Sequence, residues 1–165
     1  MSINDVMNRA IALRNRGRGK EAIRVLAPEM AALRHSAPGS GLLATLYWEE
    51  SDWKKAADWF GQTVKLSPRS ERASLGLFQS LWDLGKVEEA FDEMRRFLVI
   101  GESEEYKRVL REILQEKRTE SGSAIAASEL PLEERFDVNF AERAGLEWRK
   151  SNRLTRLSSE KMQHA

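Results

Sequence analysis

The stretch that decides the fold covers residues 40–68, SGLLATLYWEESDWKKAADWFGQTVKLSP. Each half carries apolar residues at helical spacing, Leu43, Ala44 and Tyr47 in the first half and Ala56, Phe60 and Val64 in the second. This spacing predicts two helices, each with one apolar face. The polar run 49–52 separates them, and Pro68 ends the second helix. A single hairpin cannot bury both faces, so the pattern predicts neighbouring hairpins of the same kind.

Composition limits the class of protein. The chain has 165 residues, of which 41% are hydrophobic and 32% charged, and its formal net charge is +1. These values are typical of one soluble helical domain with an extension. The absence of cysteine excludes disulfides, thiolate metal sites and a cysteine nucleophile. The amino terminus lacks a signal-peptide pattern and no apolar run reaches about 18 residues, so we expect a cytoplasmic protein without a membrane span.

The sequence repeats itself every 34 residues. Four columns of small or apolar residues share this step: Ala22, Ala56 and Ala90; Ala10, Ala44 and Phe78; Leu13, Tyr47 and Leu81; Leu26, Phe60 and Met94. A fifth column, Gly17, Ser51 and Gly85, falls at the turn between the two helices of each unit. Five columns in register over three units indicate a true repeat, in which small residues mark close helix contacts.

The pattern resembles the tetratricopeptide repeat family. Its family positions are matched best by the second unit, at Ala44, Tyr47, Ala56, Phe60 and Pro68. The resemblance covers roughly residues 3–104 and implies an all-α fold, an α-solenoid of three helical hairpins. Three features depart from the family pattern. The early tryptophan is replaced by Val6, Ser40 and Ser74, the final proline by Arg34 and Glu102, and Pro28 interrupts the first unit, where it should kink or end a helix.

The remainder of the chain divides into three parts. Residues 104–117 predict an amphipathic helix that caps the stack, which gives a repeat domain over residues 3–117. Residues 118–130 are rich in small residues and predict a linker. Residues 131–165 form a carboxy-terminal extension that begins with a helix and ends in a basic tail; its apolar residues recur every four positions, at Leu132, Phe136, Phe140, Ala144 and Trp148.

The family resemblance implies a binding site on the first helices of the repeats. These helices would line a concave groove with Met7, Ile11, Leu42, Thr45, Trp48, Arg72, Leu75, Gln79 and Trp82. Trp48 and Trp82 stand 34 residues apart and could anchor a partner, since aromatic anchors supply much of the affinity at protein interfaces. Two readings stay open for them: an exposed apolar strip, or indoles buried by the carboxy-terminal helix. A tail lying in its own groove would compete with the partner.

A carboxylate clamp of the kind found in tetratricopeptide co-chaperones is not expected. The clamp positions correspond here to Met7, Ile11, Leu42, Arg72 and Gly76, and only Arg72 can donate to a carboxylate. The run 14–20, RNRGRGK, lacks the spacing of a nucleotide-binding loop and fits the turn between two repeat helices. The basic residues of 149–161 could contact nucleic acid, but a solvated tail explains them as well.

Catalysis is not expected either. The two histidines, His35 and His164, form no catalytic or metal-binding pattern with other residues. The sequence therefore predicts a non-catalytic protein–protein interaction module without cofactor or metal, which binds a peptide or helix of a partner in an apolar, tryptophan-bearing groove. The alternative is a dedicated chaperone or neutralising partner of one client, such as a secreted effector or toxin. Chaperones of certain bacterial secretion systems resemble this chain in size and carry three such repeats. A nucleic-acid adaptor that uses the basic tail is a third class.

Overall fold

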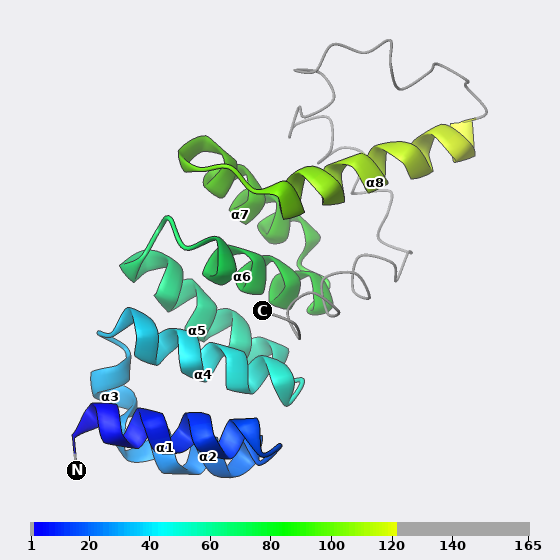
Figure 1. Ribbon diagram of the computed structural model, residues 1–165. Coiled ribbons are helices and arrows are strands. Elements are labelled where there is room, and N and C mark those ends of the chain that lie inside the picture. Colours follow the sequence, from blue (N-terminus) through cyan, green and yellow to red (C-terminus); the bar gives the residue numbers. More distant parts are fainter. Residues whose placement is uncertain (1, 122–165) are drawn as a thin grey trace. The chain divides into compact units, whose positions relative to one another are not determined.

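The computed structural model describes residues 2–121, and within α8 it describes residues 113, 114 and 116–121 by their backbone alone. Every regular element in this part of the chain is helical, as the sequence predicts (Figure 1). The elements are α1 (Ile3–Asn15), α2 (Gly19–Leu26), the 3-10 turn η1 (Ala27–Glu29), α3 (Met30–Leu33), α4 (Ala37–Glu49), α5 (Trp53–Leu66), α6 (Glu71–Asp83), α7 (Val87–Ile100) and α8 (Glu104–Ser121). None of these helices is long and apolar enough to cross a membrane.

The chain forms two compact units, Met1–Leu84 and Gly85–Ala165. In the first unit, α1 packs against α2, α4 against α5, and α5 against α6, while α2 also contacts α4 (Figure 1). The helices that the sequence predicts on both sides of the 49–52 break are therefore confirmed, as α4 and α5. The largest fully buried side chains of this unit come from α2 to α6: Leu26, Leu33, Leu43, Leu46, Phe60 and Phe78.

The 34-residue columns correspond to equivalent structural positions. Ala22, Ala56 and Ala90 all have no exposed surface. The turn column is just as regular, because Gly17, Ser51 and Gly85 all have a positive φ, of 72°, 60° and 74°. Glycine adopts this left-handed conformation without strain, whereas serine does so at a cost. A shared backbone conformation at the same position of each 34-residue repeat confirms that the three turns are built alike.

Helix starts in the first unit follow from short polar residues. Ser2, Ser36, Asp52 and Ser70 each accept a hydrogen bond from a backbone N–H in the first turn of the helix that follows. Such caps satisfy N–H groups that have no partner inside the helix. The expected effect of Pro28 is confirmed, since α2 ends at Leu26 and the chain continues through η1 before α3.

The second unit contains α7 and α8 in its described part. Phe97 of α7 lies against Tyr106 of α8, with ring centroids 5.9 Å apart, and Tyr106 has no exposed surface. Ser103 caps α8 by accepting a hydrogen bond from the Tyr106 N–H at 3.1 Å. The linker predicted from residue 118 starts too early, because α8 continues to Ser121 through good helix formers such as Lys117 and Glu120. The predicted extension, 131–165, lies outside the described residues.

The cap of α5 makes a testable contribution to stability. The Lys55 ammonium lies 2.9 Å from the Asp52 carboxylate and lowers the pKa of that carboxyl below its ordinary value of 3.8; the Lys55 N–H adds to the effect. We expect Asp52→Ala to lower the free energy of unfolding by about 1 kcal/mol at neutral pH. Because the folded-state pKa is lowered, this contribution is complete above the ordinary value and is lost as the pH falls through the folded value.

Urea unfolding of wild type and Asp52→Ala between neutral pH and pH 3 measures this difference. Asp52→Asn is the control, since asparagine also caps a helix but does not titrate in this range. A difference between wild type and Asp52→Ala that is the same at every pH would show that the charge of Asp52 has no part in the cap.

Candidate functional site

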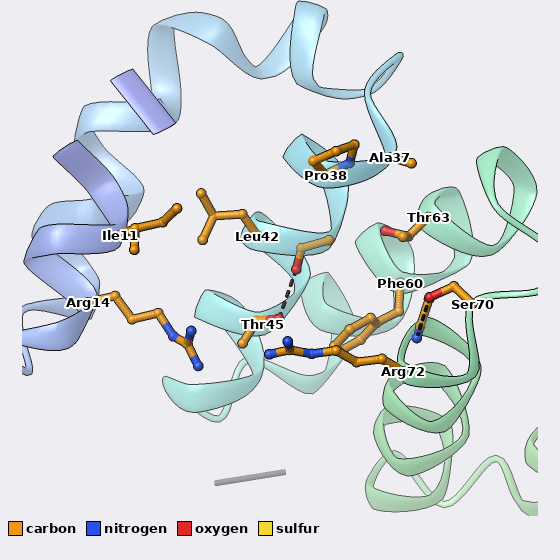
Figure 2. Close-up of a pocket in the computed structure, with 12 residues that line it drawn as sticks. Ile11, Arg14, Ala37, Pro38, Leu42, Thr45, Phe60, Thr63, Ser70 and Arg72 are labelled. Atoms are coloured by element: carbon orange, nitrogen blue, oxygen red, sulfur yellow. Dashed lines mark hydrogen bonds between the residues drawn. The ribbon is translucent and has the colours of Figure 1, made fainter. Parts of the chain in front are cut away.

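The described part of the first unit contains a pocket of about 330 Å³ between its helices (Figure 2). Residues from α1, α4, α5 and the start of α6 line it: Ile11, Arg14, Ala37, Pro38, Gly41, Leu42, Thr45, Phe60, Thr63, Ser70, Arg72 and Ala73. A cavity of this size accommodates one or two large side chains or a small ligand. The site is built on helices that pack against one another, which fixes the positions of its walls.

Apolar side chains make most of the wall. Ile11 of α1 and Leu42 of α4 extend toward one another across one side of the pocket, and Phe60 of α5 contributes a ring from the core (Figure 2). Ile11 is 38% exposed, Leu42 is half-buried and Phe60 is buried. The pocket thus connects exposed apolar surface at its edge with the buried core beneath it. An apolar side chain that entered the pocket would remove the exposed surface of Ile11 and its own surface from water.

The hydroxyl groups of the wall are occupied within the protein. Thr45 Oγ1 donates to the Gly41 carbonyl at 2.8 Å, and Ser70 Oγ accepts from the Ala73 N–H at 3.3 Å. Thr63 Oγ1 lies 2.9 Å from the Trp59 carbonyl oxygen and 3.0 Å from Ser40 Oγ. These hydroxyl groups therefore have hydrogen-bond partners within the protein, and a ligand need not supply polar groups at these positions.

Two arginines bring charge to the pocket. Arg14 pairs with Glu49 through two Nε contacts of 2.9 Å and one Nη2 contact of 2.5 Å, and this carboxylate raises the pKa of Arg14. Arg72 is exposed and has no hydrogen bond or ion pair with any residue that the structure describes. The two guanidinium groups extend from opposite walls toward one another, one on either side of Thr45 (Figure 2). Glu49 thus neutralises Arg14, whereas Arg72 has no charged partner in the part of the chain that the structure describes.

Four of the nine residues that the sequence predicts for a groove line this pocket: Ile11, Leu42, Thr45 and Arg72. Met7 and Leu75 are half-buried and lie outside its lining. Trp48, Gln79 and Trp82 are buried, with 6%, 0% and 8% of their surface exposed. The structure therefore does not present the tryptophan-bearing strip as open surface, and the accessible apolar wall is formed by Ile11 and Leu42 instead.

The indoles pack against aromatic neighbours in the first unit. Trp48 meets Trp53 edge-on at 6.1 Å between ring centroids, and Trp82 stacks on Phe78 at 5.9 Å. The Trp48 Nε1 donor is buried without a hydrogen-bond partner among the described residues. An amphipathic pattern alone cannot distinguish a binding aromatic from a core aromatic, because both stand at the same helical spacing.

The sequence places Phe60 on the apolar core face of its helix and gives no indication that Phe60 or Thr63 belongs to a site. Both come from α5, the second helix of its hairpin, and they reach the pocket beside Gly41 of α4. A side-chain Cβ at Gly41 would lie 3.6 Å from Thr63 Cγ2, an ordinary contact distance, so the missing side chain keeps this wall open. A glycine in the interior of an amphipathic helix is the signal that could have indicated the opening, since it lowers helix stability without a turn to explain it.

No protein-family model matches the chain, and comparison with curated proteins finds no match. Within the described residues, no group of three histidine, aspartate or glutamate side chains could hold a metal ion.

Proposed function

We propose that the protein is a protein–protein interaction module that receives an apolar side chain of a partner peptide or helix in the pocket of its first unit. The observation that carries this proposal is the continuity of exposed Ile11, half-buried Leu42 and buried Phe60 around one cavity. Binding energy at interfaces is concentrated where one side chain fills a desolvated pocket. A scaffold of packed helices is suited to this mode of binding, because it loses little conformational entropy when the partner binds.

We also propose that the helices form tetratricopeptide-like hairpins in a three-unit α-solenoid. The 34-residue columns of buried alanines and the three turns with positive φ support this interpretation. Each 34-residue hairpin would then bury its apolar face against the neighbouring hairpin, as in other helical repeats. In that arrangement α1, α4 and α6 are equivalent first helices, and all three contribute to the pocket lining.

Filling the pocket from within tests the function. We expect Gly41→Leu to reduce the affinity for a partner peptide by about tenfold or more, because the new side chain would occupy the space that the peptide requires. Peptides are first selected from a displayed random library against the full chain and then measured by isothermal titration calorimetry.

Gly61→Leu is the matched control. Gly61 also lies inside a helix, but it does not line the pocket, and a Cβ there would meet no other described atom within 4 Å beyond its own helix. Its affinity should equal that of the wild type, and thermal unfolding checks that both variants fold. Equal peptide affinity for Gly41→Leu and wild type would contradict the proposed function, as would a selection that yields no peptide.

A further inference from the structure

We infer that the pocket selects a partner segment that presents one aliphatic side chain beside a single carboxylate, with Arg72 binding the carboxylate and Glu49 excluding a second one. This inference rests on the proposed function and adds the chemistry of the partner.

Arg72 is placed where local electrostatics disfavour it. It is the second residue of α6, so its positive charge lies at the end of the helix where unpaired N–H groups already create positive potential. Glu71 stands beside it in the same first turn but forms no ion pair with it, and Arg72 has no ion pair with any other residue in 2–121. A carboxylate bound here would be attracted both by the guanidinium, which can donate two parallel hydrogen bonds, and by the helix end. Residues that break a local rule without an internal compensation are typical of functional surfaces.

The Arg14–Glu49 pair limits the charge that the pocket can receive. Arg14 and Arg72 are the charged members of the lining, and Glu49 neutralises Arg14 through a bidentate contact. The lining together with Glu49 therefore carries one net positive charge, not two. A second carboxylate near Arg14 would have to displace Glu49 or lie next to its negative charge, and both are unfavourable. Glu49 is therefore a specificity-determining residue that need not touch the partner.

The apolar wall determines the side chain beside the carboxylate. Ile11 and Leu42 face the cavity together, and neither offers a hydrogen-bond donor or acceptor (Figure 2). The hydroxyls of the wall already have partners within the protein. A polar side chain that entered would lose its hydrogen bonds to water without replacement, whereas an aliphatic one would gain from burial. Charge and wall together define an aliphatic residue with one adjacent aspartate or glutamate.

The first arm of the test uses the peptides selected against the full chain. A selected peptide is synthesised in three forms: as selected, with its acidic residue replaced by the amide, and with a second acid added beside the first. We expect the amide form to bind about tenfold more weakly to the wild type, and Arg72→Gln to lose the same factor for the acidic form only. Arg69→Gln is the matched control, since Arg69 is exposed, close in sequence and outside the pocket lining.

The second arm tests Glu49. We expect Glu49→Gln to bind the two-acid peptide about fivefold more tightly than the wild type does, because Arg14 then becomes available, while its affinity for the one-acid peptide changes little. Arg14→Gln combined with Glu49→Gln should remove this gain. Thermal unfolding of each variant checks that the folded state is retained.

Two results separate this inference from the function on which it rests. If peptides bind in a manner that Gly41→Leu abolishes, yet acidic and amide forms bind equally, the pocket binds peptides and the carboxylate inference is wrong. If Gly41→Leu leaves binding unchanged, the function itself is wrong and the inference falls with it. A Glu49→Gln variant that shows no gain for the two-acid peptide would overturn the role of Glu49 alone.

Discussion

Gly76→Ala is expected to lower the free energy of unfolding by roughly 1–3 kcal/mol, although the same exchange inside a helix normally raises it. Gly76 lies in α6, and a Cβ built on it would stand 2.5 Å from Cε1 and 2.7 Å from Cε2 of Phe60. Phe60 is 1% exposed and belongs to the core of the first unit, so its ring can give way only by shifting toward the pocket that it lines, which would disrupt its core contacts. Overpacking of this kind typically costs about 1–3 kcal/mol, more than the ~1 kcal/mol gained from helix propensity.

Urea unfolding followed by circular dichroism measures this effect, and two variants make the result specific. Gly61→Ala provides the control, because a Cβ there meets no described atom of another element within 4 Å; it should gain about 0.5–1 kcal/mol. Phe60→Leu combined with Gly76→Ala should cost less than the sum of the two single changes, since the smaller side chain makes space for the new methyl group. Equal gains in Gly76→Ala and Gly61→Ala would show that α5 and α6 do not approach as closely as the structure places them.

The sequence predicted the helices well because their pattern is local. Apolar spacing, polar breaks and prolines act within a few residues, and they determine where α4 and α5 begin and end. The 34-residue step also indicated the turn column, although the left-handed conformation of Ser51 could not be read from its side chain, since serine seldom adopts it. Only the equivalence with Gly17 and Gly85 indicates it. The end of α8 was harder to place, because Thr119 and Ser121 occur in both helices and linkers, while Arg118 and Glu120 between them favour a helix.

The candidate site was predicted less completely, for a physical reason. A site depends on which side chains remain accessible after the helices pack, and the periodicity of one helix contains no information about its neighbours. Ile11 and Trp48 both have helical spacing on first helices, yet Ile11 is exposed and Trp48 is buried. The pairing of Arg14 with Glu49, 35 residues away, likewise follows from packing between α1 and α4. The lack of an ion pair at Arg72 within residues 2–121 also follows from the packed structure and not from the sequence around it.

Trp48→Ala is expected to lower the free energy of unfolding by about 3–5 kcal/mol, as removal of a buried aromatic side chain does in other protein cores. Trp48 is 6% exposed and packs edge-on against Trp53, so truncation would leave a cavity between α4 and the start of α5. Trp48→Phe should cost less than about 1.5 kcal/mol, because it retains most of the volume and removes a buried Nε1 donor that has no described partner. Urea unfolding of the three proteins measures both differences.

The comparison with Ile11→Ala separates a core residue from a binding residue. Ile11 is 38% exposed and lines the pocket, so its truncation should change stability by about 0.5 kcal/mol or less while it weakens binding of the selected peptide. Trp48→Phe should show the opposite, with peptide affinity equal to that of the wild type. If Trp48→Ala unfolds at the same urea concentration as the wild type but loses peptide binding, Trp48 is an accessible anchor and the assignment of Ile11 and Leu42 as the binding wall is wrong. The two substitutions are thus expected to act on different quantities, because one residue holds the helices together and the other faces the partner.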